Sequence, residues 1–108
     1  AAIQKNCQQV MDQFMAIKPR PQGIFIANAS GACIHTMLVS RGVVPMRDVI
    51  MIAGDRTLVP EYLEPFPIAI DIHVREIGAL ATKMLFWRME NPDALGFQCM
   101  TRADLVLP

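Results

Sequence analysis

Hydrophobic and polar positions alternate along this chain with two different periods. Over residues 2–17, apolar side chains recur every three to four positions, and Gln, Lys and Asp fill the positions between them. This spacing predicts an amphipathic helix, which Pro19 and Pro21 end. Residues 24–27 then form a short continuous apolar run, typical of a parallel strand that is covered on both faces.

The rest of the chain repeats this alternation. We expect helices over residues 30–41 and 73–90, one helical turn within residues 59–64, and strands within residues 48–53, 68–70 and 100–107. Gly42 stands where a left-handed C-cap would end the first of these helices, and Asn91-Pro92 stops the second. Strands separated by helices at this spacing predict an α/β fold, with an open parallel sheet sandwiched by helices in a Rossmann-like three-layer arrangement.

Composition adds to this picture mainly by exclusion. The apolar fraction of 53% exceeds the usual one, which predicts deep burial or an apolar face that another segment covers. No apolar run reaches the ~18 residues of a membrane span, so we expect no membrane partner. Ten basic and ten acidic side chains cancel and are scattered along the chain, which argues against nucleic-acid binding by this segment alone.

The cysteines and the first residues indicate a cellular setting. Cys7, Cys33 and Cys99 are odd in number and lack the paired spacing of a zinc site, so we expect reduced thiols in a cytoplasmic protein. The chain begins at Ala1 without an initiator Met or a signal segment, and we expect it to be a piece of a longer protein.

Motifs of catalysis are missing from the sequence. There is no phosphate-cradling glycine motif, no nucleophile elbow and no paired acid and base, so we expect no enzymatic activity, no metal and no cofactor. His35 falls within a predicted helix and His73 at the start of another. An exposed or capping role is favoured for both over metal binding or catalysis.

Polar residues do follow two of the predicted strands. Asn28 comes after the first strand and Asp55 after the second, and open parallel sheets bind ligands beyond the carboxyl ends of their strands. An amide and a carboxylate together suit a polyhydroxylated ligand. The alternative is that Asn28 caps the following helix and Asp55 makes an Asx turn, and the sequence leaves both open.

Six stretches, spread in order over nearly the whole chain, have the spacing of a known family. They are residues 21–28, 41–49, 52–55, 64–70, 75–81 and 103–107. The most specific is Gly42-Val43-Val44-Pro45-Met46-Arg47-Asp48-Val49, followed by a short strand and Gly54-Asp55. Together they resemble the effector-binding core of the lactose and galactose repressor family, which has a periplasmic-binding-protein-like fold.

The resemblance implies two α/β lobes hinged around a small-molecule effector, a sugar or related metabolite, and a DNA-binding headpiece ahead of them. Residues 1–70 would belong to the second lobe, and residues 71–108 would supply a crossover, a helix and a strand of the first. Effector contacts would come from Asn28 and Asp55, with Ser30 and Arg56 beside them.

The resemblance also implies a homodimer. Its contact would involve Met37 and Arg41 on the helix after Asn28, and Tyr62 and Leu63 in the loop after the second strand. The alternative is that Met37 and Leu63 are ordinary core residues.

Three departures from the family pattern bear on the ligand. Ala29 stands where the family usually has an Asp, Arg56 replaces a second carboxylate, and the chain ends at Pro108, where the family often has an Arg. A simple neutral sugar is therefore in doubt. Arg56 would recognise an anionic group if it faces the cleft, and is otherwise a solvated surface residue.

Three functions compete at this point. The leading hypothesis is a ligand-responsive regulator without catalytic activity. The alternative is an extracytoplasmic solute-binding protein of the same fold, which the three cysteines and the missing signal segment disfavour. The third, a piece of an α/β enzyme, is disfavoured by the missing catalytic motifs.

Overall fold

The computed structural model describes residues 2–108 as four strands with helices between them. In chain order these are α1 (Ala2–Ala16), β1 (Gly23–Ile26), α2 (Gly31–Ser40), β2 (Ile50–Ala53), the short 3-10 helix η1 (Arg56–Leu58), β3 (Ile68–Asp71), α3 (Val74–Glu90) and β4 (Asp104–Val106). Each predicted helix and strand is present, although β2 and β4 are shorter than expected. The helical turn expected within residues 59–64 lies earlier instead, at residues 56–58, because the side chain of Asp55 caps it there.

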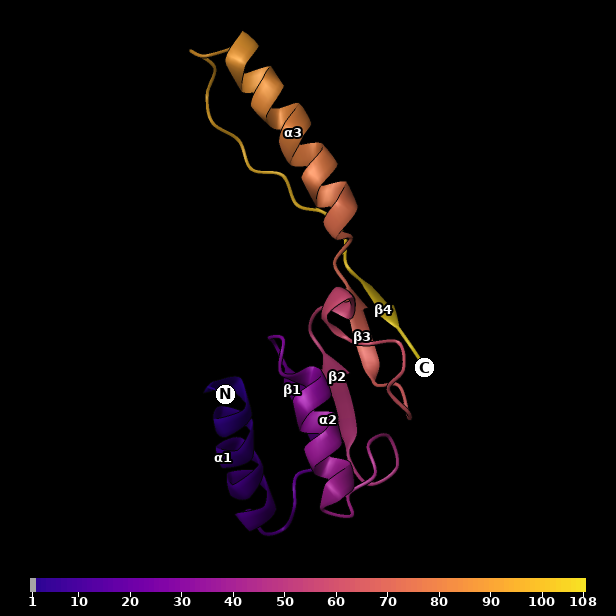
Figure 1. The fold of residues 1–108 in the computed structure, drawn as a ribbon. Coiled ribbons are helices and arrows are strands. Elements are labelled where there is room, and N and C mark those ends of the chain that lie inside the picture. The colour runs from indigo at the N-terminus through magenta and orange to yellow at the C-terminus, as the bar shows by residue number, and fades with distance from the viewer. Residues whose placement is uncertain (1) are drawn as a thin grey trace.

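The strands form one sheet in the order β1-β2-β3-β4 (Figure 1). The first three are parallel, with Ile26 opposite Ala53 and Ala53 opposite Ala69. This confirms the α/β class. The sequence predicted a parallel sheet, and β4 is the exception, because it runs antiparallel to β3. The chain returns from α3 and enters β4 at the edge of the sheet where β3 ends.

The main core lies between one face of the sheet and the helices α1 and α2. It consists of Cys7, Met11, Phe14, Ile26, Ile34, Leu38, Val43, Val49 and Met51. The other face of the sheet stays open within residues 2–108, where Phe25 is 63% and Ile50 50% exposed. The expected three-layer arrangement is therefore incomplete in this part of the chain.

The segment between α2 and β2 is a turn held by its own side chains. Gly42 has a φ of 77°, the left-handed conformation that its position predicted. The Asp48 carboxylate accepts the backbone N–H of Val44 at 2.8 Å and two N–H groups of Arg47. These bonds, that of Arg47 first, lower the pKa of Asp48 to about 2. The turn directs Val43 into the core.

The helix α3 extends away from the sheet and buries none of its residues (Figure 1). The returning segment runs beside it, and the two enclose a groove of about 250 Å³ lined by Ile77, Leu80, Ala81, Met84, Cys99 and Thr101. The C-terminal end of α3 is bonded to the segment that follows it, because the Arg88 side chain donates to the carbonyl of Ala94 at 2.6 Å. No helix within residues 2–108 is both long and apolar enough to cross a membrane.

Candidate functional site

Asn28 and Asp55 lie at the same edge of the sheet. Each follows the paired ends of β1 and β2, Ile26 and Ala53, by two residues. The strands approach closely at this edge because Gly54 has no side chain. Its N–H donates to the carbonyl of Ile26 at 2.8 Å, and a Cβ on Gly54 would lie only 3.3 Å from the Cα of Ala27. The fold thus brings the two predicted ligand-binding residues to neighbouring positions.

Both side chains also make local hydrogen bonds. Asn28 Oδ1 accepts the backbone N–H of Ser30 at 2.9 Å. Asp55 Oδ1 accepts the N–H of Thr57 at 2.9 Å and its hydroxyl at 2.7 Å. These are the turn and cap interactions of the alternative interpretation. Among residues 2–108, however, no hydrogen bond engages the Asn28 amide nitrogen or Asp55 Oδ2, so each side chain has one polar group that the fold does not use.

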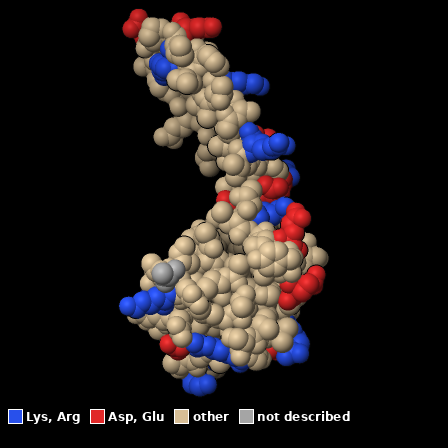
Figure 2. Space-filling model, in the orientation of Figure 1, with Lys and Arg blue, Asp and Glu red and all other residues tan. Residues whose placement is uncertain are grey.

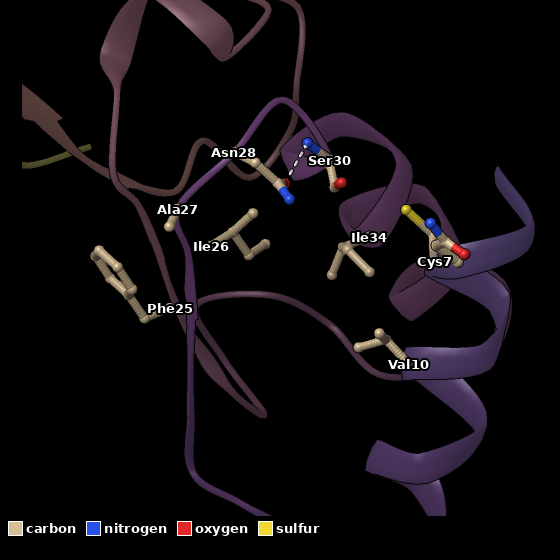
Figure 3. A pocket seen from close by; sticks show the side chains of 9 residues that line it. Cys7, Val10, Phe25, Ile26, Ala27, Asn28, Ser30 and Ile34 are labelled. Atoms are coloured by element: carbon tan, nitrogen blue, oxygen red, sulfur yellow. Dashed lines mark hydrogen bonds between the residues drawn. The ribbon is translucent and has the colours of Figure 1, made fainter. Parts of the chain in front are cut away.

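A cavity of about 220 Å³ opens beside Asn28 and Ser30 (Figure 3). Its wall is mostly hydrocarbon, from Ile26 on β1, Ile34 on α2 and Val10 on α1. In Figure 3 these side chains point toward the space between the elements, with the Asn28 amide at the rim. An apolar wall with a few polar groups at its rim is the usual make-up of a small-molecule site.

The structure separates Arg56 from this cavity. Arg56 lines a different, open cavity of about 350 Å³, together with Glu61, Phe66 and the residues at the end of β4. The physical cause is the Asp55 cap, because it turns the chain into η1 immediately after the strand end. Of the four predicted ligand-binding residues, Asn28 and Ser30 line one cavity and Arg56 lines another. Asp55 follows the end of the neighbouring strand and lines neither cavity.

The predicted dimer residues divide into core and surface. Leu63 is buried in a second core cluster with Ala53 and Val59, as the alternative interpretation held. Met37 is partly buried against the main core, whereas Tyr62 is 80% exposed. Arg41 is half-buried and forms an ion pair with Asp12 of α1 at 2.7 Å. Only part of the expected surface is therefore accessible.

Both histidines have roles that the sequence did not predict. His35 is buried, and its ring Nε2 donates to the carbonyl of Pro65 at 2.8 Å, so the expected exposed or capping role is wrong. His73 stands at the N-cap position of α3, but its side chain makes no cap bond and instead binds Asp104 at 2.7 Å. Asp71, which ends β3 at the same edge as Asp55, was also missed. No group of three or more candidate metal ligands occurs in the described part of the chain.

A comparison of folds finds a similar arrangement of helices and strands in a known protein. The chain is similar to the solved structure of a transcriptional regulator LacI from Bacillus cereus subsp. cytotoxis, with a TM-score of 0.84 and 21% sequence identity. The likeness covers 95% of this chain and 37% of that protein. No protein-family model matches the chain, and no curated protein matches it in sequence. The chain therefore shares its fold with about a third of that regulator.

Proposed function

We propose that this chain is the effector-binding part of a ligand-responsive transcriptional regulator and has no catalytic role. The observation that carries the proposal is the position of Asn28 and Asp55, each two residues beyond the paired strand ends Ile26 and Ala53 and each with one polar group unused by the fold. The similar LacI regulator supports the regulatory role. DNA would be bound by another part of the protein, since this segment carries no net charge.

The proposed effector is a sugar or related hydroxylated metabolite. Asn28 would donate to one hydroxyl and Asp55 Oδ2 would accept from another, with Ser30 at the cavity rim. Arg56 faces a different cavity beside Glu61, so an anionic group at Asn28 would not be held by Arg56 in this arrangement. We therefore keep Asn28, Ser30 and Asp55 as the proposed contacts.

The lobes are proposed to divide at Asp71. Residues 1–70 would belong to one lobe, because α1, α2, β1 and β2 all contribute to the main core and its neighbouring cluster. Residues 71–108 would belong mainly to the other, because α3 packs on no part of that core and buries none of its residues. An effector that binds the closed arrangement of the lobes better than the open one would shift the protein toward closure.

The test separates ligand contact from the structural cap at Asp55. A panel of neutral sugars and sugar phosphates is screened against the full-length protein by thermal shift, and each hit is titrated by calorimetry. Asp55→Asn keeps Oδ1 as the cap acceptor but removes the charge, so it should melt like the parent and bind roughly ten- to hundredfold more weakly. Asn28→Ala should weaken binding about tenfold, because its hydrogen bonds are neutral.

Thr57→Val is the matched control, because it removes a hydroxyl bond to Asp55 without touching the proposed contact. It should leave the affinity unchanged. Normal binding by Asp55→Asn would place the ligand elsewhere. A full-length protein that binds the ligand but binds no DNA would favour a solute-binding protein instead.

A further inference from the structure

The connection between the sheet and α3 consists of two segments that meet at β3 and β4. One runs from β3 through Ile72 and His73 into α3, and the other returns over residues 91–103 to β4. In Figure 2 the molecule narrows between the sheet body and α3, and acidic and basic side chains gather at this narrow part. The orientation of α3 relative to the sheet therefore depends on a few residues.

Two carboxylates face each other where these segments separate. Asp71 and Asp104 are directly opposite in the antiparallel pairing of β3 with β4, at the end of the ladder. Residues directly opposite each other in such a pair project to the same face, and like charges in these positions destabilise the pairing. The pairing of Asp71 with Asp104 therefore needs a positive charge or hydrogen-bond donors to stabilise it.

His73 supplies donors to both carboxylates. Its backbone N–H donates to Asp71 Oδ1 at 2.9 Å, and its ring Nε2 donates to Asp104 Oδ2 at 2.7 Å. The other ring nitrogen, Nδ1, lies 3.9 Å from both Asp71 Oδ1 and Glu76 Oε2. On the far side of Asp104, Arg102 donates to Oδ1 at 3.0 Å. These groups come from β3, α3, β4 and the segment before β4.

The strength of the contacts between His73 and the two carboxylates depends on the charge of the His73 imidazole. The bond to Asp104, together with the nearby carboxylates of Asp71 and Glu76, raises the pKa of His73 above its ordinary value of 6.5. The same bond and those from Arg102 lower the pKa of Asp104. A protonated ring offers N–H groups on both nitrogens, whereas a neutral ring that keeps the Asp104 bond turns a lone pair toward Asp71 and Glu76.

The backbone of His73 also directs the chain into α3. Its φ of 56° and ψ of 57° are left-handed, which is uncommon for a residue with a side chain. We propose that Asp71, His73 and Asp104 form a proton-dependent clasp, which fixes the orientation of α3 against the sheet when His73 is charged and loosens it when His73 is neutral. This goes beyond the proposed function and requires no effector.

The direction of the pH effect follows from linkage. Because the folded-state pKa of His73 is raised, its contribution is fully present below the ordinary pKa and is lost as the pH rises through the raised value. The contribution of Asp104, whose pKa is lowered, is present above its ordinary value of 3.8 and is lost as the pH falls below it. The clasp is therefore strongest between these two ordinary values.

The test measures the orientation of α3 in the full-length protein. Spin labels on noncanonical residues replace Ser40 on α2 and Lys83 on α3, both exposed, because native cysteines prevent selective thiol labelling. We expect one narrow distance distribution at about pH 5.5 and a clearly wider one at about pH 9. His73→Asn, which tolerates the left-handed backbone but carries no charge, should be wide at both pH values. Asp104→Asn should behave in the same way.

Nuclear magnetic resonance of the imidazole carbons provides the control. The signal that disappears in His73→Asn identifies His73 against His35, and its pKa should fall in Asp104→Asn. Equal distance distributions at both pH values, measured where this signal shows that His73 titrates, would overturn the proposal. So would pH-dependent widening that persists in His73→Asn. If that variant does not fold, Asp104→Asn and the parent protein decide the question.

Discussion

The ring Nε2 of His35, buried in α2, donates to the carbonyl oxygen of Pro65, 2.8 Å away and 30 residues further along the chain. The bond joins α2 to the segment that leads into β3. Replacing His35 by Ala would leave the Pro65 carbonyl without this donor, so we expect the free energy of unfolding to fall by ~1–3 kcal/mol. Denaturant unfolding of the full-length protein measures this difference.

Thr36→Ala is the neighbouring control for that experiment. The Thr36 side chain is exposed, and within residues 2–108 its one hydrogen bond is to the carbonyl of Ala32 in the same helix. Its replacement should change the free energy of unfolding by less than about 0.5 kcal/mol. If both variants lose the same small amount, the bond to Pro65 contributes nothing measurable.

Asp48 should make the stability of this protein depend on acid pH. Its folded-state pKa of about 2 lies below the ordinary value of 3.8, so its contribution is present above that value and is lost as the pH falls toward 2. Asp48→Asn should flatten the decline of stability over this range. Arg47→Gln should do so in part, because the Arg47 bond is the first cause of the shift. Urea unfolding at a series of pH values tests both, and a slope unchanged in Asp48→Asn would contradict the assignment.

Tyr62 and Leu63 should respond differently to substitution although they are adjacent. Tyr62 is exposed, and Tyr62→Asp combined with Met37→Asp should convert the proposed homodimer into monomers in sedimentation. Leu63 lies in the second core cluster, so Leu63→Ala should lower the free energy of unfolding by ~2–5 kcal/mol. A dimer that survives the double substitution would remove this surface from consideration.

Gly54 should not tolerate a methyl group. A Cβ there would lie 3.2 Å from the Phe25 ring and 3.3 Å from two backbone atoms of β1 and its continuation, which cannot move away easily. Gly54→Ala should cost ~1–3 kcal/mol of stability and weaken effector binding, because the strand ends must separate. Gly78→Ala on α3 is the matched control. A Cβ at Gly78 would meet nothing within 4 Å, so this change should stabilise the protein by up to about 1 kcal/mol. Equal effects of the two changes would refute the close approach.

The sequence predicted those features that depend on neighbouring residues. Helical spacing located α1, α2 and α3, and the position of Gly42 predicted its left-handed conformation. Features that depend on distant residues were missed. Nothing local to Asp104 shows that β4 enters the sheet antiparallel, and nothing local to His35 shows which face of α2 is buried.

The candidate site likewise has features that the sequence predicted and features that it did not. The strand-end positions of Asn28 and Asp55 follow from the alternation of elements, and so they were predicted. The turn into η1 that separates Arg56 from them depends on hydrogen bonds between Asp55 and Thr57, and a sequence pattern does not show which of several local bonds forms.

Asp71 belongs to two arrangements at once. It ends β3 at the sheet edge that also carries Asn28 and Asp55, and it accepts the N–H of His73. An effector at that edge that also contacts Asp71 would act on the same carboxylate as the proton on His73. Thermodynamic reciprocity then requires each to change the affinity for the other. Effector binding would then take up or release a fraction of a proton. The calorimetric enthalpy of binding should accordingly vary with the ionisation enthalpy of the buffer, most strongly near the pH at which His73 titrates.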